Sequence, residues 1–136
     1  MEYGSNINLD TAKKILSAAQ AEAFKRGFTM AIAVVDTAGN LVAFEKMDNT
    51  QIGSVEIARI KAETSVRFKR SSKAFEESVA GGGMGVKVLS MPGVISVEGG
   101  ELIVQDNKII GAIGVSGALS SQDTEIAKAG LQSLSN

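Results

Sequence analysis

The chain has 136 residues, of which 44% are hydrophobic and 21% charged, and its formal net charge is −1. This length and balance predict a single globular domain over residues 1–136, with a core of its own. The near-zero charge argues against nucleic-acid binding, which needs a basic surface, and no apolar run approaches the roughly 20 residues that cross a bilayer. Because no basic segment followed by an apolar stretch opens the chain, a cytoplasmic location without membrane partners is expected.

Cysteine and histidine are both absent from the sequence. Disulfides, thiolate nucleophiles and sulfur-rich zinc sites are therefore excluded. Hydrolases of the Ser-His-Asp type are excluded too, as are haem or zinc sites that depend on imidazole. Any chemistry has to rest on carboxylates, lysine, Tyr3, hydroxyl groups or the backbone, and we expect no metal site.

The first part of the chain predicts one helix and two strands. Apolar spacing indicates a helix over 9–26, which Asn8 can cap. A mostly apolar run over 29–36 is typical of a central strand, and a short turn leads to a second strand over 41–46.

A second helix, predicted over 53–69, places a lysine on its inward face. At about 100° per residue, Lys61 shares that face with Ile57, Thr64 and Phe68. A buried ammonium is costly unless it meets a carboxylate or an anion. Three interpretations stay open: a desolvated amine acting as base or nucleophile, a site for a ligand carboxylate, or a buried ion pair with Asp36, Asp48 or Glu45.

The middle of the chain predicts a short helix over 72–79 and then a glycine tract over 81–85. That tract lacks the preceding strand and the Lys-Ser/Thr ending of a phosphate-binding loop. A mobile loop over a pocket is the expectation instead. Val94 to Val97 is predicted to form the third strand.

The stretch 99–117 holds two β-branched runs around an Asp-Asn-Lys turn, which predicts a hairpin. Its second strand carries Gly111, Gly114 and Gly117. Since glycine packs no side chain, repeated glycine in a strand indicates close approach by something else. Two alternatives stay open: a helix packed tightly on a crowded sheet, or a pocket floor where a small molecule lies against the backbone.

A final helix is expected from Ser120 or Ser121, with Asp123 in its first turn, where the helix dipole favours a carboxylate. The order is then helix, two strands, two helices, three strands, helix. Short turns between neighbouring strands predict an α+β fold with a five-stranded antiparallel sheet flanked by helices.

Two carboxylates, Glu98 and Glu101, flank the glycine pair before the hairpin. They could share a metal or act as acid and base, or they could simply be solvated charges at a hairpin edge.

Several segments together resemble the GlcG/HbpS-like family, over about residues 9–134. They are Val34–Leu41, Met47-Asp48, Ile57–Thr64, Gly99-Gly100 and Gly111–Gly117 with Gln122-Asp123. The resemblance implies a profilin-like α+β domain that usually assembles as a homo-oligomer. Family members are described as haem-binding or haem-degrading, or accompany glycolate, diol and glycerol metabolism. A related module forms the C-terminal part of some cobalamin adenosyltransferases.

The resemblance also implies a ligand pocket, formed by Asp48, Lys61, Thr64, Gly99, Gly100, Gly114, Ser116 and Asp123. Some relatives hold haem iron through histidine, so haem here would bind through a hydroxyl, Tyr3 or a methionine such as Met84, with Lys61 facing a propionate. The chain also departs from a Gly-Gly-x-Pro pattern at Leu102.

The function that this implies is a small-molecule-binding accessory protein for haem or another anionic ligand. The alternative is an enzyme or accessory factor acting on small hydroxy acids, diols or aldehydes, with Lys61 as its amine or base.

Overall fold

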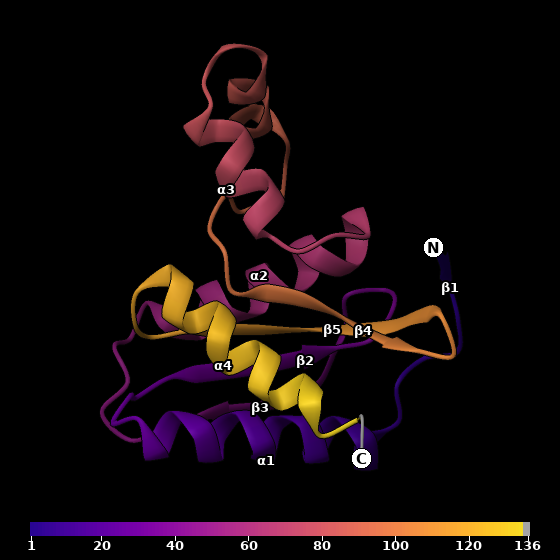
Figure 1. Ribbon diagram of the computed structural model, residues 1–136, viewed down its shortest axis with the longest axis vertical. Coiled ribbons are helices and arrows are strands. Elements are labelled where there is room, and N and C mark those ends of the chain that lie inside the picture. The colour runs from indigo at the N-terminus through magenta and orange to yellow at the C-terminus, as the bar shows by residue number, and fades with distance from the viewer. Residues whose placement is uncertain (135–136) are drawn as a thin grey trace.

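The computed structural model describes residues 1–134. Its helices are α1 (Leu9–Lys25), α2 (Ser54–Phe68), α3 (Lys73–Ala80) and α4 (Ser120–Gln132), with a 3₁₀ helix η1 (Gly83–Ser90). Its strands are β1 (Glu2–Tyr3), β2 (Ala31–Val35), β3 (Leu41–Lys46), β4 (Gly100–Gln105) and β5 (Lys108–Ser116). Figure 1 shows their arrangement. All the helices expected from the sequence are present, with bounds close to those expected, and the class is α+β.

The sheet has five strands and is mixed rather than antiparallel. The long strand β5 pairs antiparallel with β4 along one side and with β2 along the other, and β3 extends the sheet from β2. The first residues of β5 also pair with β1, and this pair is parallel, with Tyr3 opposite Ile109. The prediction of a purely antiparallel sheet is therefore wrong at this pair.

The strand expected at Val94 to Val97 is also absent, and β1 supplies the fifth strand instead. The backbone N–H of Ile95 donates to Thr64 Oγ1 at 3.1 Å, so this segment is fastened to α2 and not to the sheet. Its β-branched residues favour an extended backbone, but a strand also needs a partner with free hydrogen-bonding groups. None of the described strands pairs with this segment.

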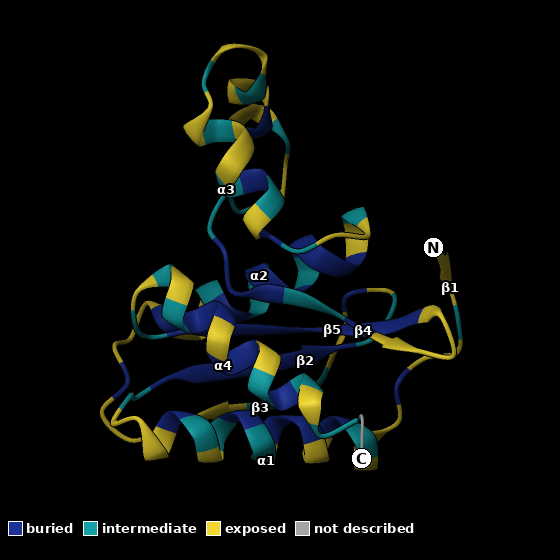
Figure 2. Cartoon of the chain, viewed as in Figure 1, coloured by how far each residue is buried: buried dark blue, intermediate teal, exposed yellow. Residues whose placement is uncertain are grey.

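The sheet lies between two helical layers, with α2 on one face and α1 and α4 on the other (Figure 1). Alternation along β2 divides its side chains between these layers. Ala31 and Ala33 face α2 and pack with Ala58, while Ile32 and Val34 join the larger core beneath α1 and α4. Figure 2 shows β2 and β5 buried between the layers. Small residues on the α2 side let that helix lie close to the sheet.

The N-cap residue predicted for α1 is confirmed, whereas the N-cap predicted for α4 is wrong. Asn8 accepts the N–H of Thr11 through Oδ1 at 2.8 Å, as predicted for α1. For α4, neither Ser120 nor Ser121 is the cap: Leu119 occupies that position, and its N–H donates to Gln122 Oε1 at 3.1 Å.

Helices α3 and η1 form an arm that projects away from the sheet (Figure 1). At its base Gly100 exchanges two hydrogen bonds with Ser72, and Phe68 meets Phe75 edge to face with ring centres 5.5 Å apart. The glycine tract 81–85 lies inside this arm, where it turns the chain from α3 into η1. None of the helices in the described residues is long and apolar enough to cross a membrane.

Candidate functional site

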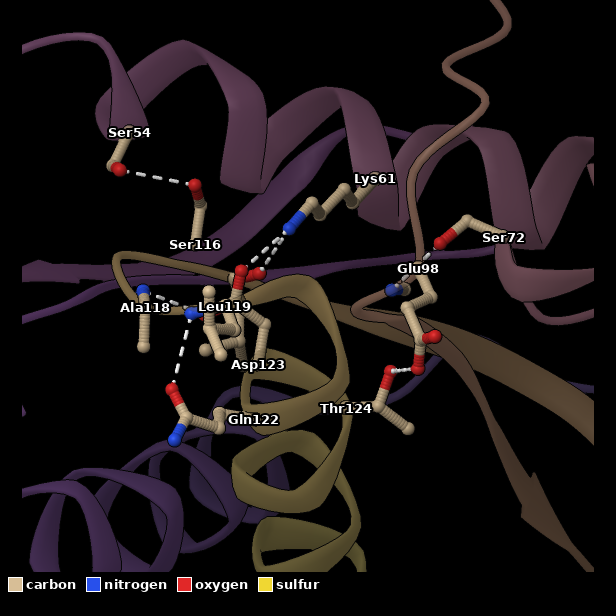
Figure 3. Close-up of polar contacts among 12 residues, drawn as sticks. Ser54, Lys61, Ser72, Glu98, Ser116, Ala118, Leu119, Gln122, Asp123 and Thr124 are labelled. Atoms are coloured by element: carbon tan, nitrogen blue, oxygen red, sulfur yellow. Dashed lines mark hydrogen bonds and ion pairs between the residues drawn. The ribbon is translucent and has the colours of Figure 1, made fainter. Parts of the chain in front are cut away.

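Lys61 is among the largest fully buried side chains of the protein, with 1% of its surface exposed. Its ammonium donates to Asp123 Oδ2 and to the carbonyl oxygen of Val115, each at 2.9 Å (Figure 3). Lys61 belongs to α2 and Asp123 to α4, so the side chain passes the end of β5 and joins helices on opposite faces of the sheet. The structure thus contains the buried ion pair that was one alternative, with Asp123 and not Asp36, Asp48 or Glu45 as the partner.

Gly99 and Gly100 leave the space through which Lys61 passes. Gly99 has φ of 127°, and a Cβ there would lie 2.8 Å from Lys61 Nζ and 2.7 Å from the carbonyl oxygen of Val115. A Cβ on Gly100 would lie 2.2 Å from the carbonyl oxygen of Lys61. Any side chain at either position would therefore push against the lysine or its backbone.

The Asp123 carboxylate is 2% exposed and is bonded through both oxygens. Oδ1 accepts the N–H of Ala118 at 2.9 Å, while Oδ2 accepts from Lys61. Burial raises the pKa of Asp123 above its ordinary value, and the hydrogen bond and positive charge of Lys61 oppose that rise. The pair is therefore held by short contacts in a place from which water is excluded.

Two buried serines continue this polar group toward the start of α2. Ser116 Oγ donates to Ser54 Oγ at 3.0 Å (Figure 3), and Gln51 Nε2 donates to the same Ser54 oxygen at 2.8 Å. The start of α2 reaches the carboxyl end of β5 through Ser54, and the first turn of α4 is joined to the middle of α2 through Asp123 and Lys61. We call Ser54, Lys61, Ser116 and Asp123 the β5 corner.

The glycines of β5 are in contact with backbone. A Cβ on Gly114 would lie 1.9 Å from the carbonyl oxygen of Ala58, and one on Gly111 would lie 2.3 Å from that of Val35. At Gly117 the carbonyl oxygen of Thr29 would be 2.3 Å away. Of the two alternatives for these glycines, tight packing of α2 and the neighbouring chain is what the structure contains.

The structure brings most of the expected pocket residues together. Gly114 pairs with Gly100 in the sheet, and both lie beneath α2 beside Lys61, Gly99, Ser116 and Asp123. Thr64 lies on α2 but its hydroxyl is turned to the segment that includes Ile95. Asp48 is exposed and lines a separate cavity between α1 and β3.

Two groups were not predicted from the sequence: Ser54, which belongs to the β5 corner, and the carbonyl of Val115, which accepts from Lys61. Ser54 could be recognised as the start of a helix, but nothing in the sequence indicates its contact with Ser116. The contact depends on how α2 lies on the sheet.

Glu98 is a second buried acid, 8% exposed, and it accepts a hydrogen bond from Thr124 Oγ1 at 2.7 Å (Figure 3). Burial raises the pKa of its neighbour Glu101 above the ordinary value, and the negative charge of Glu98 adds to the rise while Lys128 and Lys73 lower it. Among residues 1–134 no three acidic side chains gather where they could hold a metal ion. The hydrogen bond from Thr124 to Glu98 therefore joins the segment just before β4 to α4.

Comparison with known proteins places the chain in a family. Residues 7–132 match a family model described as "Haem degrading protein HbpS-like". Protein GlcG of Escherichia coli strain K12 is 38% identical over 110 residues, which cover 81% of each chain.

Two solved structures share the fold. HbpS superposes with a TM-score of 0.88 at 27% identity, covering 98% of this chain and 94% of that one. A PduOC–haem complex gives a TM-score of 0.85 at 24% identity, with 94% of each chain covered, and at this identity it supports the fold alone. With nearly its whole length matched, the chain belongs to the HbpS-like family.

Proposed function

We propose that this protein is a small-molecule-binding accessory protein whose ligand is haem or another anionic molecule, bound at the β5 corner. Membership of a family described as haem-degrading supports the ligand class. The observation that carries the proposal is the grouping of the start of α2, two hydroxyl groups and an ammonium at the carboxyl end of β5.

This corner has the chemistry that attracts an anion. Backbone N–H groups at a helix start carry partial positive charge, and an anion nearby is stabilised by them. No side chain caps the start of α2 at Gly53. The Ser116 hydroxyl donates to Ser54 Oγ, which leaves the Ser54 hydroxyl to donate to a ligand oxygen, while the charge of Lys61 is already balanced by Asp123. The N–H groups of Ser54 and Val55 donate to the carbonyl oxygens of Gln51 and Ile52, so a ligand carboxylate would replace these acceptors and add a bond from the Ser54 hydroxyl. Because the residues of the corner are buried, the start of α2 has to move to admit the ligand.

Haem fits the single chain less well than a small carboxylate does. The Tyr3 hydroxyl donates to the carbonyl oxygen of Val66 at 2.6 Å, so it is engaged elsewhere. Met84 is 80% exposed but lies on the projecting arm, whereas Lys61 is closed inside the body. The groups that would hold the iron and a propionate are therefore not together, and the geometry of the corner favours a small carboxylate over a macrocycle.

The use of Lys61 as a catalytic amine, the alternative raised by the sequence, gains no support from this geometry. The ammonium donates to Asp123 and to the carbonyl oxygen of Val115, so a nucleophilic role would require both contacts to break.

Titration with two separate probes tests the proposal. Glycolate, followed by calorimetry, is expected to bind saturably, and Ser54→Ala combined with Ser116→Ala is expected to weaken it about 10-fold, because hydrogen bonds to a charged group are lost. Ser90→Ala removes an exposed hydroxyl on the arm and serves as the control, expected to leave binding unchanged. Titration with haemin, followed through its Soret band, tests whether the protein binds a macrocycle. Absence of saturable binding for both probes would contradict the proposed function.

We also propose that the protein assembles as a homo-oligomer through its arm. The arm exposes Met84 and Leu89, at 80% and 65%, together with part of Val86. Exposed apolar side chains gathered on one segment mark an interaction surface, and an arm that packs mainly on itself leaves them for another molecule. A second copy of the chain is the occupant that we propose.

Met84→Asp combined with Leu89→Asp is expected to shift the protein to a smaller species in sedimentation velocity, because two carboxylates cannot be buried in an apolar contact. Ser17→Asp with Ser121→Asp, which adds the same charge to exposed positions on α1 and α4, controls for charge alone. A wild-type chain that sediments as a monomer would rule out assembly through the arm.

A further inference from the structure

A cavity of about 470 Å³ lies between α1 and β3, at the end of the β2–β3 hairpin away from its turn. Its lining consists of Gln20, Phe24, Gly27, Phe28, Thr29, Glu45, Lys46, Met47 and Asp48. It shares no residue with the β5 corner. We propose that this α1–β3 cavity binds a small organic cation, such as a quaternary or protonated amine with an apolar body.

The apolar wall of the cavity contains two phenylalanines, and one of them is largely exposed to solvent. Phe24, in the last turn of α1, is 75% exposed, and Phe28 follows it just beyond the helix. The Arg26 guanidinium lies 5.1 Å from the centre of the Phe28 ring and also pairs with Glu125 at 3.2 Å, so it fixes the ring while its own charge is balanced. Met47 adds a polarisable thioether, a group that adapts to the shape of a ligand.

The polar wall is acidic. Glu45 and Asp48 both line the cavity, and neither takes part in any ion pair in the part of the chain that the structure describes. In the sheet Glu45 lies opposite Ile32, whose side chain points to the α1 layer, whereas Lys46 lies opposite Ala31, on the α2 side. Because strand residues alternate between faces, the Glu45 carboxylate and not the Lys46 ammonium is on the cavity side.

Together, the aromatic wall and the acidic wall favour a positively charged ligand over a negatively charged one. The face of an aromatic ring is electron-rich, and a cation placed over it is attracted, most strongly when water is excluded. Phe24 offers such a face to a ligand, since the guanidinium of Arg26 already lies over the ring of Phe28. Two carboxylates without partners add to that attraction and repel an anion. The aromatic rings and the thioether would hold the apolar body of the ligand while its charged end faces Glu45 and Asp48. The α1–β3 cavity therefore differs in ligand charge from the β5 corner.

The test compares three probes of similar size on the full chain by calorimetry: benzyltrimethylammonium, benzyl alcohol and benzoate. The cation is expected to bind at least about 5-fold more tightly than the alcohol, by the magnitude of a cation–π contact together with a carboxylate, and benzoate is expected to bind more weakly than either. Added salt should weaken binding of the cation and leave that of the alcohol unchanged.

Variants test separately how the acidic wall and the aromatic wall contribute to binding. Glu45→Gln with Asp48→Asn is expected to remove the preference for the cation, and Phe24→Leu, which keeps apolar bulk but removes the ring face, is expected to lower its affinity about 2- to 5-fold. Glu77→Gln, which removes an exposed carboxylate on the arm, is the matched control and should change nothing. The proposal is overturned if the alcohol or benzoate binds as tightly as the cation, or if the double variant binds the cation like the wild type.

Discussion

Gly114→Ala is expected to destabilise the protein by about 3 kcal/mol or more, the upper end of what overpacking costs in a protein core. The added Cβ would lie 1.9 Å from the carbonyl oxygen of Ala58 and 2.6 Å from the backbone nitrogen of Ala62. Both atoms belong to the backbone of α2, so no rotamer change relieves the clash, and the helix has to move off the sheet. Denaturant unfolding followed by circular dichroism measures the loss.

Gly53→Ala is the matched control for this change. Gly53 has φ of −61°, and nothing lies within 4 Å of an added Cβ. The same methyl group is therefore expected to leave stability unchanged or raise it slightly, because alanine reduces the freedom of the unfolded chain. Equal stability for the two variants would mean that α2 does not rest on Gly114 in solution.

Lys61→Met is expected to cost about 3–5 kcal/mol, the usual result of leaving one member of a buried ion pair without its partner. The Asp123 carboxylate would remain shielded from water, with only the backbone N–H groups of Ala118 and Gly117 to stabilise its charge. Adding Asp123→Asn, which removes the charge but keeps an oxygen for Ala118, is expected to recover a large part of the loss. Denaturant midpoints of the wild type, both single variants and the double variant give the coupling energy.

The pH dependence of Lys61→Met gives a separate signature. Without Lys61, burial raises the pKa of Asp123 further, because only the backbone hydrogen bonds of Ala118 and Gly117 still oppose it. The native state then binds a proton that the unfolded state has released, so stability falls as the pH rises through that range. The variant is expected to be more stable at mildly acidic than at neutral pH. Lys73→Met, whose lysine is half-exposed and 3.9 Å from Glu77, should change stability by less than about 1 kcal/mol.

Much of the local structure could be predicted from the sequence because it depends on neighbouring residues. The apolar period placed α1, α2 and α4, and Asn8 was recognised as a cap from its position before the first helical residues. The same period placed Lys61 on the inner face of α2, where it is buried. Repeated glycine in β5 indicated that another group lies close to this strand, but the sequence did not show which group.

The tertiary structure decided everything that joins distant parts of the chain. Lys61 pairs with Asp123, 62 residues away, because Gly99 and Gly100 leave a passage beside β5 through which the ammonium reaches the other helical layer. The fifth strand is β1, which pairs with the first residues of β5, and not the segment at Val94, where the N–H of Ile95 is bonded to Thr64 of α2. Asp48, expected with Lys61, lines a different cavity because β3 ends beside α1. A periodic pattern states which side of an element is buried, but the partner on that side is chosen only when the elements pack.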